Sequence, residues 1–302
     1  MTKKITSFQK GILSMILALL CFSTVEVFGT FILKEGANPL TLLTLRMITA
    51  SFFLLITIKF KKYKIFNIEK TDFLRLLLHS FILSLHLILF WQGVKLLNNI
   101  PSVVLLFASV PIWTILISFI FLKERLNLMK VFSLLFGILG IVFVIGLKTN
   151  ININLIGGIT MLFASLLWSI YIIVGRKLLE KYNGFSILFY NFLFSFFFFI
   201  CIQSPAITIE ELSPRIAVYI LLLSLVSTYF AYSFHYYALL KLKASKLSII
   251  GLLKPVFSII LAGLIFSQTL NLYQSLGGLF ILIGVCLIRK EEDEEIKTYK
   301  IK

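Results

Sequence analysis

The chain has 302 residues, of which 59% are hydrophobic and 14% charged, and its mean hydropathy is +1.01. A water-soluble fold of this length needs a more polar exterior, so the composition excludes an ordinary globular domain. The net charge of +16 does not indicate nucleic-acid binding, because the basic residues lie in loops too short to form a nucleic-acid-binding fold. We therefore predict an all-α integral membrane protein.

Apolar runs of about 20 residues, the length that crosses a bilayer core, recur along the whole chain. Each run is expected to be a helix, since a helix satisfies its own backbone hydrogen bonds in lipid. The first run lacks a small-residue cleavage pattern, so we keep it as a span rather than a signal peptide. The ten predicted spans cover residues 11–33, 39–59, 73–95, 102–122, 128–147, 155–176, 184–203, 215–238, 245–266 and 272–289.

Lysine and arginine are distributed unequally between the two sides that ten spans define. The side that carries both termini holds 23 of the 29 basic residues, the other side holds 4, and 2 lie within spans. By the positive-inside rule, this bias predicts a multi-pass protein of the inner or plasma membrane with cytoplasmic termini. Residues 291–302 are rich in charge and are expected to form a flexible cytoplasmic tail.

The two halves of the chain resemble each other. A shift of 144 residues aligns Pro111 with Pro255 and also aligns two Leu-Asn-Leu segments. A shift of 146 residues aligns the opening spans, including Ser23 with Ser169. A proline, an inter-helix Leu-Asn-Leu motif and a glycine (Gly140 with Gly284) in constant register indicate an internal repeat.

The repeat predicts two five-helix units, residues 1–150 and 151–290. Because five is odd, the second unit enters the membrane from the opposite face, so the repeats are inverted. Inverted repeats are typical of secondary transporters, whose substrate site lies near the midplane between the halves. We therefore expect binding of a small organic solute and alternating access, with proton coupling as an option and with the lipid bilayer as the other partner.

Three charged residues lie inside the predicted spans. A charge at the bilayer centre costs about 2.5–3.5 kcal/mol on insertion scales, so each should face a partner or a wet cavity. Glu26 and Arg46 both lie ~10 Å below the outer boundary, which allows an ion pair that is either structural or part of a substrate or proton site. Lys254 lies near the midplane, where it could hold a carboxylate. Pro111 and Pro255 are expected to break their helices beside this cavity.

Two histidines and three aromatic residues complete the predicted substrate and proton pathway. His86 and His235 could carry protons, or they could be hydrogen-bonded packing residues. Trp168 and Tyr171 share one helical face, and Tyr232 lies on another aromatic face. These rings could line a cavity, and ordinary helix packing explains them almost as well.

Glycines gather in the last span of each half. Gly137 and Gly140 in one, and Gly277, Gly278 and Gly284 in the other, let helices approach closely. They predict a contact between the repeats or between two copies, so the expected state is a monomer or a weak homodimer.

Two other functions stay open. A membrane-embedded enzyme acting on lipid would need clustered acids and histidines near one interface, and the candidates Asp72 and His79 have no evident partners in the sequence. A lipid-linked-sugar translocator would need a lateral opening, which the sequence does not test. No nucleotide, metal or cofactor motif occurs, so we expect neither enzymatic activity nor a cofactor.

Short motifs recur in order along nearly the whole chain. They are residues 18–23, Leu45-Arg46, 111–126, 237–239, 254–257 and 277–284. In this order and spacing the chain resembles the EamA-type family of the drug/metabolite transporter superfamily. The resemblance implies export or exchange of small metabolites such as amino acids, through a central cavity open alternately to each side. Gln268 departs from the glutamate frequent in the second repeat, at a helix end.

Overall fold

The protein is described by a computed structural model in which all regular elements are helices. The structure describes residues 6–35, 38–63, 68–97, 103, 106–124, 127–145, 154–202, 213–266 and 272–301, and no strand occurs in these ranges. The helices of the first half are α1 (Ser7–Lys34), α2 (Pro39–Lys61), α3 (Lys70–Leu97), α5 (Val110–Phe121) and α6 (Leu128–Ile145). Those of the second half are α7 (Leu155–Leu178), α8 (Gly184–Ile202), α9 (Pro214–Ser224), the π-helix η2 (Leu225–Phe230), α10 (Ala231–Lys241), α11 (Ala244–Ile250), the 3₁₀-helix η3 (Gly251–Leu253), α12 (Lys254–Phe266) and α13 (Leu272–Ile301).

Helix length and composition confirm an all-helical membrane protein. Within the described ranges, 6 helical stretches are long and apolar enough to cross a bilayer. They are Ser7–Val25, Pro39–Lys61, Lys70–Leu97, Leu155–Leu178, Gly184–Ile202 and Pro214–Lys241. Shorter apolar helices, Val110–Phe121, Leu128–Phe143 and Ser275–Leu287, pack beside them. The count of ten spans stays a prediction.

Polar caps and prolines define where several helices begin. Asn38 precedes α2, and its side chain accepts a hydrogen bond from the Leu40 N–H. Asn154 caps α7 and Ser213 caps α9 in the same way. A side-chain oxygen at this position satisfies a backbone donor that has no partner within the helix. Prolines in the first turns of α2 and α9 fit because that turn needs no donor from them.

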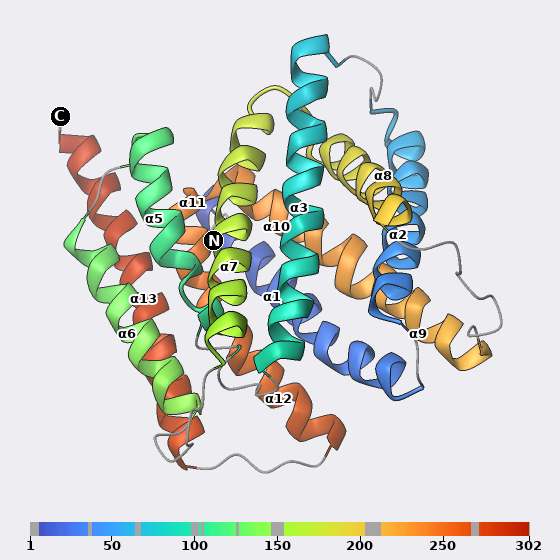
Figure 1. Ribbon diagram of the computed structural model, residues 1–302. Coiled ribbons are helices and arrows are strands. Elements are labelled where there is room, and N and C mark those ends of the chain that lie inside the picture. The colour runs from blue at the N-terminus through green and yellow to red at the C-terminus, as the bar shows by residue number, and fades with distance from the viewer. Residues whose placement is uncertain are drawn as a thin grey trace.

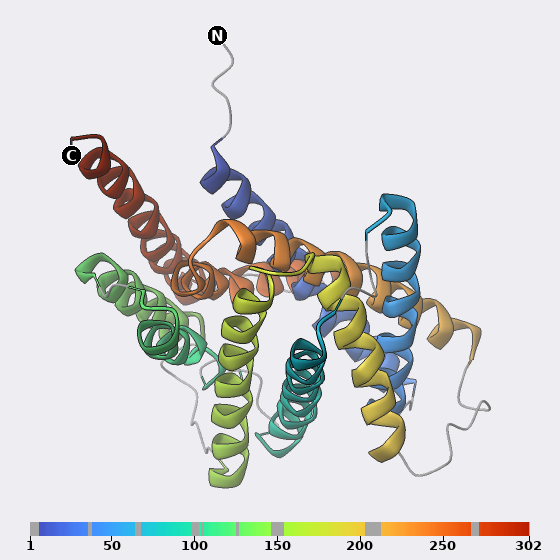
Figure 2. The same cartoon turned by 90° about the horizontal axis from the view of Figure 1, so that it is seen from above.

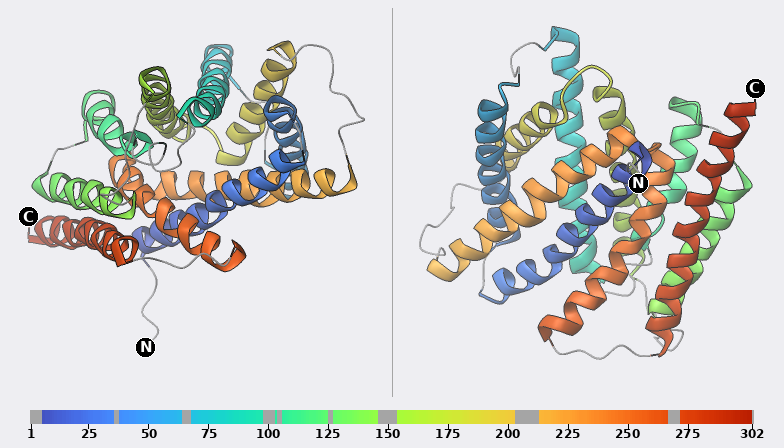
Figure 3. Two further views of the ribbon diagram at one scale, coloured as in Figure 1. Left: turned by 60° about the horizontal axis from the view of Figure 1, so that its bottom comes forward. Right: turned by 180° about the vertical axis from the view of Figure 1, so that it is seen from behind.

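The two halves pack against each other in matching pairs. Helix α7 of the second half lies between α3 and α5 of the first half. In the same way, α1 of the first half lies between α10 and α12 of the second half (Figures 1 and 3). Similarly, α3 lies between α7 and α8 (Figure 2), while α2 contacts both α8 and the α9–η2 segment. The remaining large contacts join equivalent spans, α2 with α8 and α6 with α13. Exchanging the first five predicted spans with the last five therefore reproduces the main contacts between the halves.

Glycines bring α6 and α13 into close contact, and the two helices lie side by side in Figure 3. A Cβ placed on Gly140 would lie 2.6 Å from the Gly277 carbonyl oxygen, and one on Gly284 would lie 2.7 Å from the Ser133 carbonyl oxygen. No side chain fits at those distances. The expected close approach of these two spans is confirmed within one chain, and the weak homodimer stays a prediction.

The acidic end of the chain is helical. We expected residues 291–302 to form a flexible tail, but α13 continues as a helix to Ile301. Glutamate and lysine favour helix, and a segment that extends an existing helix avoids the cost of nucleation. Helical structure does not decide whether this end moves, so the flexible cytoplasmic tail stays a prediction.

Glu124 fixes the loop after α5 to the second half. Its carboxylate accepts hydrogen bonds from the N–H groups of Ala244, at 2.8 Å, and Ser245, at 3.3 Å, and from the Ser245 hydroxyl. These groups belong to the first turn of α11, where backbone donors lack helical partners. Lys130 lies 3.8 Å from the same carboxylate. The charge therefore holds in place the helix that leads to the break at Lys254.

Candidate functional site

Six rings from four helices meet at the centre of the bundle. The Trp168 ring of α7 lies 5.0 Å from the His86 ring of α3, 5.6 Å from the His235 ring of α10 and 5.2 Å from the Tyr171 ring of α7. Tyr232 of α10 and Phe22 of α1 join them, with 5.1 Å between their ring centroids. Five of the six are predicted pathway residues, and the sequence reasoning missed only Phe22, which the repeat aligns with Trp168.

The two histidines in this cluster differ in their hydrogen bonds. His86 is 5% exposed, and its Nδ1 lies 2.8 Å from the Ala164 carbonyl oxygen. A carbonyl only accepts, so Nδ1–H is the donor. His235 is 1% exposed, and neither ring nitrogen has a hydrogen-bond partner among the described residues. Buried polar groups are nearly always satisfied, so this imidazole calls for an explanation such as a ligand or water.

Arg46 contacts a π-helix in the second half. It is 3% exposed and donates through Nε to the Thr228 hydroxyl and through Nη2 to the Ser227 carbonyl, the latter at 3.2 Å. The Thr228 hydroxyl in turn donates to the Leu223 carbonyl at 3.0 Å, five residues earlier, which is the π-helical spacing. The hydroxyls of Thr24 and Ser227 lie 2.6 Å apart. π-helical turns are frequent at functional sites.

Sequence reasoning placed Glu26, not these hydroxyls, next to Arg46. The Glu26 side chain lies outside the described part of the structure, so the ion pair stays a prediction. The pair Ser227-Thr228, in the middle of an apolar run, is a sequence signal that could have indicated a polar partner. No pattern in the sequence indicates the π-helix itself.

Lys254 begins α12 at a break in the predicted ninth span. Helix α11 ends at Ile250, the 3₁₀ segment follows, and Pro255 occupies the first turn of α12. In the first half, α5 begins at Val110 with Pro111 in its first turn. Proline lacks a backbone donor and suits this position. In both cases a predicted span is interrupted, and a new α-helix begins one residue before the proline.

Equivalent serines bind the backbone at both breaks. The Ser23 hydroxyl of α1 lies 3.4 Å from the Lys254 carbonyl oxygen, and the Ser169 hydroxyl of α7 lies 3.0 Å from the Val110 carbonyl oxygen. The 146-residue shift aligns the two serines, and the 144-residue shift aligns Val110 with Lys254. Each half therefore supplies the hydroxyl that contacts the break in the other.

Two cations act electrostatically on rings of this cluster. The charges of Lys254 and Arg46 both act on His86, and that of Arg46 also acts on Tyr232. Arg46 and Lys254, both far from His86 in the sequence, are thus each within electrostatic range of it. An anionic group at this place would be attracted by both cations.

A second buried polar network joins α3, α7 and α10 to α8. Asn191 of α8 donates to the hydroxyls of Tyr171 and Tyr236, both at 3.3 Å, and accepts from the Ser80 hydroxyl at 3.0 Å. His79 stacks on Tyr171 at 4.3 Å, and its Nε2 lies 3.0 Å from the Tyr171 carbonyl oxygen. The view that His79 has no partner was therefore wrong. Asn191 was missed because one amide in an apolar run is not distinctive.

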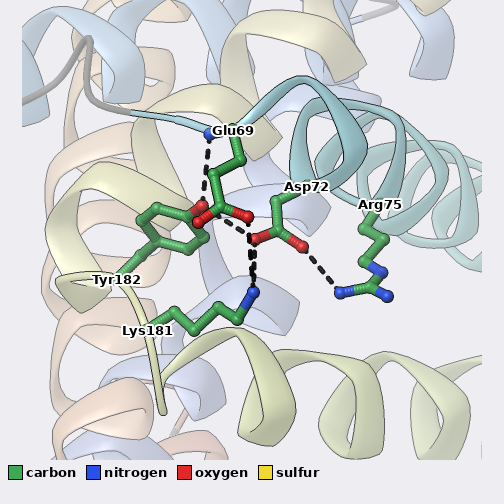
Figure 4. Close-up of polar contacts among 5 residues, drawn as sticks. All are labelled: Glu69, Asp72, Arg75, Lys181 and Tyr182. Carbon is green, nitrogen blue, oxygen red and sulfur yellow. Dashed lines mark hydrogen bonds and ion pairs between the residues drawn. The ribbon is translucent and has the colours of Figure 1, made fainter.

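Asp72 is the centre of a charged cluster at the end where α3 begins and α7 ends (Figures 1 and 4). Its side chain is 1% exposed and accepts hydrogen bonds from Tyr182 at 2.8 Å, Lys181 at 3.0 Å and Arg75 at 2.7 Å. The Glu69 N–H donates to the Tyr182 oxygen at 3.3 Å. The bond to Asp72 raises the pKa of the Lys181 ammonium, and burial raises the pKa of the Tyr182 hydroxyl. The view that Asp72 lacks partners was also wrong.

The described residues contain no group of three or more His, Cys, Asp or Glu side chains that could hold a metal ion. The candidate site therefore consists of cations, imidazoles, hydroxyls and aromatic rings. Such groups are suited to bind and orient an organic ligand.

The helical bundle and its buried polar centre define a polytopic membrane protein. The chain belongs to the EamA-like transporter family, whose model matches residues 9–146 and again residues 155–290. The resemblance inferred from the motifs is thus confirmed. Family membership supports a membrane transporter.

Individual relatives agree with this assignment. An uncharacterized transporter of Archaeoglobus fulgidus is 28% identical over 213 residues, 67% of this chain and 72% of that protein. An uncharacterized transporter of Clostridium kluyveri is 23% identical over 91% of this chain and 92% of its own length. The uncharacterized transporter YoaV of Bacillus subtilis is 25% identical over 77% of this chain and 80% of its own. A solved crystal structure with a TM-score of 0.78 and 16% identity covers 92% of this chain and 95% of that chain, so it shares the fold.

Proposed function

We propose that the protein is a secondary transporter, an exporter or exchanger of a small organic metabolite such as an amino acid. In this proposal ten spans form two inverted five-helix halves in the cell membrane, with both termini in the cytoplasm. The halves enclose a midplane cavity and rock against each other, so that the cavity opens alternately to each side. No nucleotide motif is present in the sequence, so the energy comes from a gradient or from exchange.

The pair of serine contacts is the observation that carries this proposal. Ser23 contacts the break at Lys254, and Ser169 contacts the break at Val110. Irregular backbone at membrane depth is tolerated where it is buried in protein or lines a cavity. Two equivalent breaks, each held by the opposite half, support a site that lies between the repeats and changes when they move.

The charges and rings around this site indicate what it binds. We assign the carboxylate of the substrate to Arg46 and Lys254, the two cations that act on His86. The rings of Trp168 and Tyr232 form a wall for the apolar part of the substrate. His235, with both nitrogens unpaired among the described residues, would donate to or accept from a polar group of the substrate.

The remaining predicted residues have supporting roles in this proposal. Tyr171 extends the wall formed by Trp168, with their rings stacked at 5.2 Å. Pro111 and Pro255 maintain the two helix breaks, and Glu26 is the group for proton coupling. A carboxylate in a membrane cavity binds protons more readily because desolvation disfavours its charged form.

The test begins with a thermal-shift screen of the purified protein against amino acids, nucleosides and other metabolites, since a ligand stabilises the state that it binds. Exchange of the stabilising compound is then measured in proteoliposomes. Lys254→Met should reduce exchange by about tenfold or more, because a charge-assisted hydrogen bond to the substrate is lost. Lys241→Met, which removes an exposed lysine at the end of α10, is the matched control and should leave exchange unchanged. Wild-type exchange by Lys254→Met would remove this lysine from the site.

A further inference from the structure

The cluster around Asp72 joins the two halves at one end of the bundle. Asp72 and Arg75 belong to α3 of the first half, whereas Lys181 and Tyr182 follow α7 of the second half. The Asp72 carboxylate is buried and bonded to Lys181 and Tyr182 across this boundary (Figure 4). Hydrogen bonds to a charged carboxylate are stronger than bonds between neutral groups. The cluster therefore resists separation of α3 from α7 at this end, which is predicted to be cytoplasmic.

The internal repeat places opposite charges at or next to the equivalent positions of the other end. The 146-residue shift aligns Lys181, after α7, with Glu35, after α1. The 144-residue shift places Arg215, in the first turn of α9, beside the position equivalent to Asp72. The signs of the charges are exchanged between the two ends. The third span of the first half carries the acid Asp72, whereas the third span of the second half carries the base Arg215.

The equivalent residues are not paired with each other in the structure. Glu35 and Arg215 are both exposed, and neither forms an ion pair within the described part of the chain. Four residues away on each helix, the rings of Phe31 and Tyr219 are stacked at 5.2 Å. Glu35 and Arg215 therefore lie one helical turn, about 5.4 Å, beyond an existing contact between α1 and α9.

We propose that these two charge sets are alternating gates: the Asp72–Lys181–Tyr182 set closes the end shown in Figure 4, and Glu35 pairs with Arg215 when that end opens. If the halves rock so that α3 separates from the α7–α8 turn, the end of α1 and the start of α9 would approach each other. This follows because the two halves would exchange their equivalent contacts between the two states. The structure is then the state closed at the Asp72 end. This inference rests on the alternating access proposed above.

Crosslinking tests the gates without any solute. Cys21, Cys201 and Cys286 are replaced by serine, and Glu35→Cys and Arg215→Cys are introduced together. The rate of oxidative crosslinking between them is measured in membranes. Asp72→Asn, which weakens the closed end, should raise this rate about tenfold.

The matched control is Glu180→Gln, which removes an exposed acid one residue before Lys181 and should leave the rate unchanged. Tyr182→Phe keeps the ring and removes one bond to Asp72, so it should produce a smaller rise and replaces Asp72→Asn if that variant does not fold. Equal rates in the control and in the gate variants would overturn the proposal, as would a pair that never crosslinks in any variant. Because the assay uses no substrate, a failure to find exchange would count against the proposed function alone.

Discussion

The contact between α6 and α13 and the centre of the bundle are built on opposite principles. Along the first, glycines let the two backbones approach, and the rings of Phe136 and Phe280 stack at 6.3 Å. At the centre, Arg46 and the histidines are buried among hydroxyls, carbonyls and aromatic rings. Close packing of small residues stabilises helix pairs in membranes, whereas polar groups inside a membrane are costly and usually functional. The difference fits the proposed function, in which a fixed support lies beside the binding site.

Gly140→Leu should disrupt the contact between α6 and α13 and should have the largest effect of the variants considered. Its side chain would begin 2.6 Å from the Gly277 carbonyl oxygen, and no rotamer relieves a clash that starts at Cβ. Overpacking alone costs about 1–3 kcal/mol, and a contact with backbone should reach or exceed the upper value. We expect loss of folded protein, measured by size-exclusion chromatography of detergent extracts and by thermal unfolding.

Gly278→Ala is the control for that variant. The nearest atom to its new Cβ would be Val256 Cγ1 at 4.0 Å, an ordinary contact. It should fold and exchange like the wild type. A Gly140→Leu protein as stable as Gly278→Ala would show that α6 and α13 are not closely packed.

His235→Phe should separate stability from function at the centre. A buried polar group without partners costs about 1–3 kcal/mol, so its replacement by an apolar ring should raise the midpoint of thermal unfolding. Binding of the screened ligand should weaken at the same time, because the imidazole no longer contacts it. Tyr237→Phe, on the exposed side of α10, should change neither quantity. A destabilised His235→Phe protein with normal ligand binding would contradict this assignment.

Ser23→Ala and Ser169→Ala test the two helix breaks at the centre. They should have the smallest effect on stability. Each removes one hydrogen bond to a helix break, so each should lower the free energy of unfolding by about 0.5–1.5 kcal/mol. The two losses should be equal if the halves are equivalent. Thr160→Val, whose hydroxyl bonds only to a carbonyl of its own helix, is the control. Clearly unequal losses from the two serines would argue against equivalent breaks.

Much of the fold could be predicted because hydropathy is a local property. The span predicted at 39–59 is the helix Pro39–Lys61, and that predicted at 155–176 is Leu155–Leu178. Capping residues and prolines determine these boundaries. The central site was predicted in part, since five of its six rings were selected from charge, aromaticity and helical spacing alone.

The partners of these residues could not be predicted, and the reason is geometric. A membrane helix is apolar on nearly all sides, so its sequence carries little information about which side faces the protein. The partner of Arg46 was sought on the neighbouring helix, yet Thr228 lies 182 residues away. His79 and Asp72 were set aside because their partners are on α7 and in the turn after it.

The sequence alone determined that the chain is a membrane protein, that its two halves each match the EamA-like family model, and where charges and prolines interrupt the apolar runs. These properties depend on composition and order along the chain. The tertiary structure decided how the helices rotate about their axes, where a π-helix widens the eighth predicted span, and which side chain meets which. That choice depends on packing between segments distant in sequence, because lipid contacts every apolar surface about equally well and so does not select one side of a helix.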